Sequence, residues 1–241
     1  MKLFVTDYDD TLYTNDISIK KNIEKIKELQ QKDFIIMIAT GRSFPSIKQK
    51  TIEQNIPYDY LSCADGSIIY DKNDNIIYAK ELDSEIIEPF HEFYQNLNYE
   101  EIQFSYPKGY SNSLNTQEKL LGINVCISTR IYNNKIEKQF FKLKKKYKNY
   151  NYLAYTHPNY SYLCIKPLNI NKSYTVSLIK DKLDIKDKDI YIIGDSSNDV
   201  EMLQDFHGVG MTNSCPEILK IVKTTYNEVS DYINEILKNL F

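Results

Sequence analysis

Short apolar runs alternate with amphipathic stretches at both ends of this 241-residue chain. Residues 2–7, 33–42 and 59–82 contain apolar runs that end in polar residues, which is typical of buried strands. Residues 17–32 and 43–56, which lie between them, have apolar side chains at helical spacing. Strands that alternate with helices indicate a parallel sheet with helices on both faces. The sequence therefore predicts an α/β protein with a doubly wound parallel sheet.

The middle of the chain has a different order. A helical pattern at residues 83–98 is followed by two stretches typical of strands, and the same order returns from residue 133 onward. This repeated helix–strand–strand unit predicts a small antiparallel sheet with two helices on one face. We therefore expect a core domain at residues 1–81 and 165–241, and an inserted α+β domain at residues 82–164.

Composition narrows the classes of function. A net charge of -3 and a pI near 5.7 give the chain no overall attraction for nucleic acid or an anionic membrane. Its apolar runs are too short to span a bilayer, and its first residues do not resemble a secretory signal. The four cysteines have no CxxC spacing, which indicates thiols in a reducing compartment. We expect a cytoplasmic protein without a nucleic-acid or membrane partner, and the sequence does not indicate an oligomeric state.

Carboxylates gather after two of the predicted strands. Asp7, Asp9 and Asp10 follow the first apolar run, and the stretch from Asp195 to Asp199 follows a later one. Neighbouring like charges repel by about 1 kcal/mol in water and by up to roughly 4 kcal/mol nearer a protein interior. Turns and helix caps also favour aspartate. Two such clusters on one sheet, however, suggest a shared cation, and oxygen ligands with room for water and phosphate suit Mg²⁺.

Polar residues follow other predicted strands as well. Thr40-Gly41-Arg42 and Asp65-Gly66-Ser67 come after the second and third strands, and Lys172 begins a later helix. Ligands of open parallel sheets bind at the carboxyl ends of the strands, so these groups are expected to meet at one edge. Each motif alone also fits an ordinary loop, and Lys172 alone fits a solvated lysine. No G-x-G-x-x-G follows the first strand, which disfavours a dinucleotide-binding dehydrogenase.

Taken in series, these motifs resemble those of the haloacid dehalogenase superfamily. "DYDDT" matches the D-x-D-x-T signature, "IIMIATGR" matches the second motif, Lys172 falls at the third-motif lysine, and "IYIIGDSSND" matches G-D-x-x-N-D. The helix–strand–strand repeat is similar to the C2-type cap of the Cof-type phosphatases. The resemblance implies a Rossmann-like core with an inserted cap domain, and hydrolysis of a phosphomonoester through an aspartyl-phosphate.

The resemblance also implies roles for the motif residues. Asp7 is expected to be the nucleophile and Asp9 the general acid/base, while Lys172 stabilises negative charge. Mg²⁺ is expected to bind Asp7 and Asp195, together with Asp9 through its backbone carbonyl.

Other motif residues are expected to support the phosphoryl group. The residues expected to hold its oxygens are Thr40, Gly41, Lys172 and Asn198. Thr11 is expected to order the loop that carries Asp9, and Asp199 to position Lys172 or a metal-bound water. Two roles stay open for Arg42: it contacts the leaving group, or it pairs with a nearby carboxylate.

Three positions depart from the family pattern. Asp10 and Ser173 stand where many relatives have glycine, and Asp65 stands where Cof-type relatives usually have asparagine. Asp10 is expected to face solvent without abolishing activity. Asp65 places an additional charge near the site, where it is expected to affect the preference for leaving groups.

The leading hypothesis is a Mg²⁺-dependent phosphatase that acts on a small phosphorylated metabolite, such as a sugar phosphate or a nucleotide-derived cofactor. One alternative is a phosphomutase of the same superfamily, which would keep its aspartyl-phosphate from water. Another is a non-catalytic, phospho-accepting regulatory domain, although the insert and the "GDSSND" motif argue against it. A degenerate binding protein is disfavoured because Asp7, Asp9, Thr40, Lys172 and Asp195 are all present.

Overall fold

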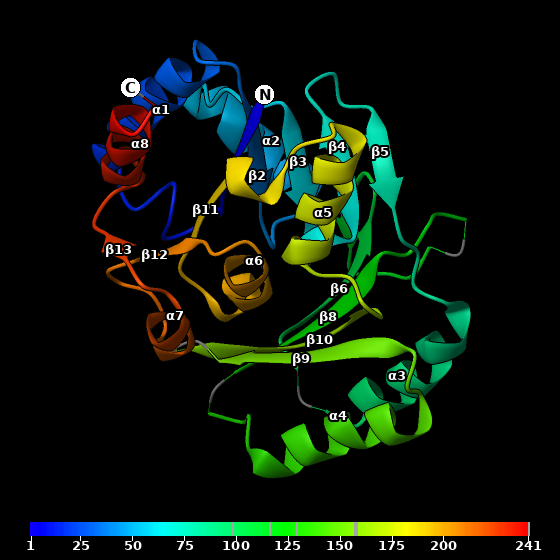
Figure 1. The fold of residues 1–241 in the computed structure, drawn as a ribbon. Coiled ribbons are helices and arrows are strands. Elements are labelled where there is room, and N and C mark those ends of the chain that lie inside the picture. Colours follow the sequence, from blue (N-terminus) through cyan, green and yellow to red (C-terminus); the bar gives the residue numbers. More distant parts are fainter. Residues whose placement is uncertain (98, 116, 129, 157–158, 241) are drawn as a thin grey trace. The chain divides into compact units, whose positions relative to one another are not determined.

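The computed structural model describes residues 1–97, 99–115, 117–128, 130–156 and 159–240. The chain forms two compact units (Figure 1). The first unit comprises Met1–Ile77 and Asn171–Phe241, and the second comprises Tyr78–Ile170. The boundaries expected from the sequence, after residues 81 and 164, both fall inside the second unit.

The first unit is built on an eight-stranded sheet with the order β13-β12-β11-β1-β2-β3-β4-β5. The strands in chain order are β1 (Lys2–Thr6), β2 (Phe34–Ala39), β3 (Tyr60–Cys63), β4 (Ile68–Asp71), β5 (Ile76–Ala79), β11 (Ile190–Gly194), β12 (Val209–Met211) and β13 (Thr225–Tyr226). Neighbouring strands from β13 to β3 are parallel, and β4 runs antiparallel to β3. Strands β4 and β5, which lie within the predicted strand region 59–82, are neighbours in the sheet.

Helices cover this sheet on both faces. They are α1 (Ser18–Gln30), α2 (Phe44–Gln54), α5 (Lys172–Lys182), α6 (Val200–Asp205), α7 (Pro216–Ile221) and α8 (Val229–Lys238), with short 3₁₀ turns η1 (Ala64–Gly66), η3 (Asp187–Asp189) and η4 (Ser197–Asp199). Helix α1 packs against α8, whereas α5 packs against α6 and α6 against α7. Figure 1 shows these two groups on opposite sides of the sheet. The prediction of an α/β protein with a doubly wound parallel sheet is confirmed.

The sheet has a switch point beside its first strand. From β1 the chain proceeds to β2 and β3 on one side, and it later returns as β11 on the other side of β1. Residues Leu3 to Thr6 of β1 pair in register with Ile190 to Ile193 of β11. Because the two strands are parallel, their carboxyl ends lie side by side, where open α/β sheets bind ligands. The residues that follow these two strands are Asp7 and Asp195.

The second unit is an antiparallel sheet with the order β7-β6-β8-β10-β9. Its elements are η2 (Ser84–Ile86), α3 (Ile87–Gln95), β6 (Glu101–Tyr106), β7 (Gly109–Ser111), β8 (Gly122–Ser128), α4 (Asn134–Lys146), β9 (Tyr150–Thr156) and β10 (Tyr160–Pro167). Both helices lie on the same face of the sheet (Figure 1). Strand β7 was not expected, because three residues are too few to show an alternating pattern.

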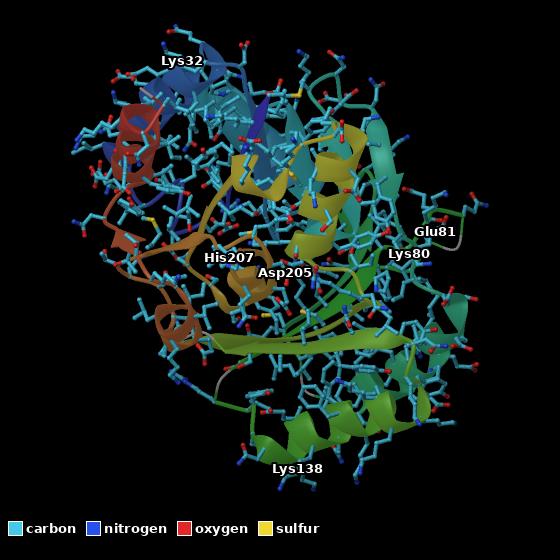
Figure 2. All side chains as sticks on the ribbon, in the orientation of Figure 1. Lys32, Lys80, Glu81, Lys138, Asp205 and His207 are labelled. Carbon is cyan, nitrogen blue, oxygen red and sulfur yellow. The ribbon has the colours of Figure 1, made fainter. Side chains whose placement is uncertain are left out.

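Aromatic side chains dominate the core of the second unit. Phe140 of α4 is fully buried and contacts the rings of Phe90, Phe93 and Tyr152. The lysines of α4 point the other way: Lys138 lies on the outer side of the helix, and the run from Lys144 to Lys146 is exposed. Figure 2 shows Lys138 directed away from the sheet, so α4 has one apolar and one basic face.

The described part of the chain has no helix long and apolar enough to cross a membrane. The four cysteines are thiols, and Cys63, Cys126 and Cys164 are buried.

We expect Phe140→Ala to lower the free energy of unfolding by about 3–5 kcal/mol, because it removes a buried ring and leaves a cavity. Phe141→Ala, at the partly buried neighbouring position, should cost about 1 kcal/mol. Urea unfolding, monitored by the near-ultraviolet circular dichroism of tyrosine, would measure the loss in both variants. Equal losses for the two variants would contradict this account of the core.

Candidate active site

Asp7 begins the loop at the carboxyl end of β1. Its backbone N–H donates to the carbonyl of Ile193 at 3.2 Å, which continues the pairing of β1 with β11 by one residue. Thr6 donates its hydroxyl to the Asp7 carbonyl at 2.7 Å, and the N–H of Leu12 donates to the same carbonyl at 3.3 Å. Asp7 is only 4% exposed. The sheet and the loop together hold this carboxylate in a fixed, buried position.

Lys172 is the buried cation of the site. It follows Asn171, whose side chain accepts the N–H of Tyr174 at 2.8 Å and so caps the start of α5. Lys172 is 1% exposed, and its Nζ donates to Oδ1 of Asp7 at 2.8 Å and to Oδ1 of Asp199 at 2.6 Å. Burial alone would lower the pKa of Lys172, but the charges of Asp199 and Asp7 outweigh burial and raise this pKa. Lys172 is therefore an ammonium ion that joins two carboxylates.

Asp199 is held by the backbone that follows β11. Its Oδ2 accepts the N–H groups of Asp195 and Ser196, each at 3.0 Å. This carboxylate lies so close to the strand that a Cβ on Gly194 would be 2.7 Å from Asp199 Cγ. Glycine is thus needed at position 194, because the Asp199 carboxylate occupies the space that a side chain at this position would fill.

Asp195 completes a cluster of carboxylates. The hydroxyl of Thr11 donates to its Oδ1 and that of Ser196 to its Oδ2, so Thr11 links the loops after β1 and β11. The pKa of Asp195 is raised to about 6, chiefly by burial and also by the charge of Asp199, although the two hydroxyl groups act in the opposite direction. Burial likewise raises the pKa of Asp7 well above its usual value, against the opposing effect of Lys172.

The carboxylates of Asp7, Asp195 and Asp199 fit a divalent cation. One oxygen from each lies within 4.8 Å of the others, and all three residues are buried. Three carboxylates and the Lys172 ammonium leave two uncompensated negative charges when all are ionised. An all-oxygen donor set with this charge suits Mg²⁺, and such an ion would favour the ionised carboxylates that burial disfavours.

Asp9 lies apart from this cluster. Its two carboxylate oxygens accept from Arg42, with Nε to Oδ2 at 2.8 Å and Nη2 to Oδ1 at 2.7 Å. Arg42 also donates to the hydroxyl of Ser46 at 3.0 Å, and its guanidinium lies 5.2 Å from the ring centroid of Tyr8. Of the two roles left open for Arg42, the structure shows the carboxylate pair. The ligand expected from Asp9 is its backbone carbonyl, and that role stays a prediction.

The residues expected to hold phosphoryl oxygens come from the next loops. Thr40 is buried after β2, and its Oγ1 accepts the N–H of Arg42 at 3.1 Å. Gly41 beside it is exposed. Asn198 donates its Nδ2 to Oδ1 of Asp65 at 2.8 Å. The structure thus brings Asn198 to the loop after β3, a contact that the motifs did not indicate.

Comparison with known proteins decides the family. The family model for haloacid dehalogenase-like hydrolases matches residues 4–234. The chain belongs to the haloacid dehalogenase-like hydrolases. A putative phosphatase of Buchnera aphidicola is 26% identical, with 97% of each chain covered. The 5-amino-6-(5-phospho-D-ribitylamino)uracil phosphatase YcsE of Bacillus subtilis is 24% identical over 98% of this chain and 90% of that protein. A solved haloacid dehalogenase-like hydrolase from B. subtilis has a TM-score of 0.81 at 17% identity, with both chains fully covered.

Two features of this hydrolase were not fully anticipated. Asp199 binds Lys172, in line with its expected positioning role, but its carboxylate also lies in the same cluster as those of Asp7 and Asp195. Asp10 is exposed, as expected, and its φ of 56° lies in the left-handed region. Glycine adopts that conformation without strain, and aspartate tolerates it better than most residues.

The raised pKa of Asp195 predicts how stability depends on pH without divalent cations. The folded value of about 6 exceeds the ordinary 3.8, so the folded state binds the proton more tightly. This proton stabilises the folded state by at most about 3 kcal/mol. The stabilisation is fully present below about pH 4 and is lost as the pH rises through about 6. Urea unfolding in EDTA should show the loss in the wild type and a smaller one in Asp195→Asn.

Added Mg²⁺ should restore stability above about pH 6 in the wild type, because ion binding favours the ionised carboxylates. Asp184→Asn, at an exposed site, serves as the matched control and should behave like the wild type. Identical pH profiles for wild type and Asp195→Asn would show that Asp195 does not titrate in this way.

Proposed function

We propose that this hydrolase is a Mg²⁺-dependent phosphatase that acts on the phosphomonoester of a small metabolite through an aspartyl-phosphate on Asp7. One observation carries the proposal: Asp7 is a buried carboxylate at the switch point of the sheet, bound by Lys172 inside a cluster with Asp195 and Asp199. A buried carboxylate that is held in place by an ammonium group in this way suits nucleophilic attack on a phosphoryl group.

The names of relatives support a phosphatase. The matched Buchnera protein is named a putative phosphatase, and the matched B. subtilis protein is named for a phosphorylated ribitylamino uracil. Both matches extend over nearly the whole of this chain. We therefore propose a sugar phosphate or a cofactor-type phosphomonoester as the substrate class, with the second unit as a cap that selects the leaving group.

In the first proposed step, Asp7 attacks phosphorus. Lys172 donates to Oδ1 of Asp7, so we assign the attack to Oδ2. The new bond joins this oxygen to phosphorus, while the bond from phosphorus to the substrate oxygen breaks. Asp9 gives a proton to the leaving oxygen, and the substrate departs as an alcohol.

In the second step, water attacks the phosphorus of the aspartyl-phosphate. Asp9, now ionised, takes a proton from this water, and the bond from Asp7 to phosphorus breaks. Orthophosphate leaves, and both carboxyl groups return to their initial states. Thr40, the N–H of Gly41, and Asn198 would hold the phosphoryl oxygens during both steps.

The charge balance of the site assigns a supporting role to the remaining residues. Asp7, Asp195 and Asp199, together with the predicted backbone carbonyl of Asp9, would hold Mg²⁺. When bound, the ion would supply positive charge to the phosphoryl oxygens. Lys172 adds a fixed positive charge beside Asp7. Arg42 determines where the Asp9 carboxylate lies, and its hydrogen bonds weaken when Asp9 carries the proton, because a neutral carboxyl group is a poorer acceptor than a carboxylate.

Hydrolysis of an aryl phosphate tests the function directly. We expect wild-type activity with Mg²⁺, none in EDTA, and a loss of at least about 1,000-fold in Asp7→Asn, because an amide is a poor nucleophile. Asp10→Asn is the matched control: Asp10 is exposed and lies outside the carboxylate cluster, so activity should be retained. Release of orthophosphate would be measured by a colorimetric assay.

The outcomes separate the competing functions. Slow hydrolysis that requires an activating sugar bisphosphate would indicate a phosphomutase. Stable phosphorylation of Asp7 without turnover would indicate a regulatory domain. Unchanged turnover in Asp7→Asn would refute the proposed mechanism.

Arg42→Lys tests how Asp9 is positioned. Lysine keeps the charge but cannot bind both oxygens of a carboxylate in the same planar geometry. We expect kcat on alkyl phosphates to fall by roughly tenfold or more, and kcat on aryl phosphates to fall less, because a good leaving group needs less protonation. Arg130→Lys, at an exposed position in the second unit, is the control. An equal loss on both substrate classes would argue against a role for Arg42 through Asp9.

A further inference from the structure

The loop after β3 has an unusual backbone. Ala64, Asp65 and Gly66 all have positive φ, at 50°, 51° and 96°. A Cβ on Gly66 would collide with the backbone carbonyl of Asn171, just before Lys172. Such a run of left-handed residues is costly and persists only where the surroundings determine it. The loop is therefore held in place by its neighbours.

Two backbone hydrogen bonds join this loop to the one after β2. The N–H of Ala64 donates to the carbonyl of Arg42 at 2.9 Å, and the N–H of Asp65 donates to the carbonyl of Thr40 at 3.1 Å. These bonds do not involve the Asp65 side chain. The buried carboxylate of Asp65 is thus placed by the backbone beside the residues expected to bind phosphate.

The Asp65 carboxylate fixes the orientation of the Asn198 amide. Its Oδ1 accepts from Nδ2 of Asn198 at 2.8 Å. An ionised carboxylate only accepts hydrogen bonds, so it must face the NH₂ end of an amide and not the carbonyl end. The other end, Oδ1 of Asn198, is buried and has no hydrogen-bond partner among the described residues.

The donor end of this amide lies beside Gly41. Nδ2 of Asn198 is 3.7 Å from the position that a Cβ on Gly41 would occupy, and Oδ1 of Asp65 is 2.9 Å from it. An NH₂ group has two protons, and Asp65 accepts one of them. The second remains for an oxygen of the phosphoryl group. A reversed amide would instead present a carbonyl oxygen, which repels that group.

We propose that Asp65 is a positioning residue that acts through Asn198, and that it keeps the amide donor of Asn198 directed to the phosphoryl group of the substrate. The proposal deepens the phosphatase function proposed above and rests on it. Asparagine at position 65 would accept from Asn198 with its carbonyl or donate to it with its NH₂, so both amide orientations would be allowed. Aspartate allows only one.

A purely electrostatic effect of Asp65 predicts the opposite result. Its charge also acts on Lys172, whose pKa it helps to raise. If charge alone mattered, Asp65→Asn would remove repulsion and tighten the binding of phosphate. If Asp65 acts through Asn198, the same variant weakens the binding of phosphate. The sign of the change therefore separates the two effects.

The test uses Asp65→Asn, which keeps the size of the side chain and tolerates left-handed φ. We expect kcat/KM for an aryl phosphate to fall about tenfold and the inhibition constant of inorganic phosphate to rise several-fold, because a charge-assisted hydrogen bond is replaced by a weaker, ambiguous one. Asp184→Asn is the matched control, since Asp184 is exposed and also has a positive φ of 52°. It should leave both constants unchanged.

A double-mutant cycle with Asn198→Ala tests whether Asp65 acts through Asn198. The effects of the two substitutions should not add. In the Asn198→Ala background, Asp65→Asn should change the inhibition constant of inorganic phosphate less than twofold. The proposal would be overturned if the two substitutions weakened phosphate binding additively. It would also be overturned if Asp65→Asn left the inhibition constant of phosphate unchanged or tightened phosphate binding. A merely structural role would lower thermal stability and would not produce this coupling.

A spectroscopic measurement keeps the test independent of turnover. With ¹⁵N-labelled asparagine, the side-chain NH₂ pair of Asn198 is assigned by its absence in Asn198→Ala. Asp65→Asn should shift this pair, because the carboxylate acceptor is lost, while Asp184→Asn should not. If the wild type fails to hydrolyse any ester, the phosphatase function fails while this measurement still tests the hydrogen bond from the NH₂ group of Asn198 to Asp65. An unshifted pair would overturn the inference even in an active enzyme.

Discussion

The buried ion pair of Lys172 with Asp7 and Asp199 is the interaction on which the site depends. Removing three charged groups from water costs several kcal/mol per ion, and this cost is offset only where geometry and hydrogen bonds are good. Here the backbone N–H groups of Asp195 and Ser196 also bind Asp199, and Gly194 provides the space that its carboxylate needs. The arrangement fixes the direction of Asp7, whereas Asp195 is bound by the hydroxyl groups of Thr11 and Ser196.

The topology of the sheet explains why these groups meet. Parallel pairing of β1 with β11 places the residues that follow them side by side, and the start of α5 supplies Lys172 from a third segment. The loops after β2 and β3 are linked by backbone hydrogen bonds and extend the same edge of the sheet with Thr40 and Asp65. Rigid strands thus place each polar side chain, while the loops carry the chemistry.

Much of this could be predicted from the sequence, because the decisive signals are local. The alternation of strands and helices predicts the parallel core. The polar residues that follow the predicted strands, together with the four family motifs, select Asp7, Asp195 and Lys172. Strand β7 was missed because it is too short for a pattern. The contacts of Arg42 with Asp9 and of Asp65 with Asn198 join residues 33 and 133 positions apart. No spacing rule predicts such pairs, since they depend on how loops from different strands meet.

The order of the segments along the chain has a consequence for biosynthesis. Lys172 reaches Asp7 across 165 residues, and β1 acquires its neighbour β11 only after the second unit has been made. A chain emerging from the ribosome therefore carries an apolar central strand with one open edge until its last third is synthesised. Such an edge can pair with other chains. Truncated products of this protein are accordingly expected to aggregate, with their carboxylates never assembled into a site.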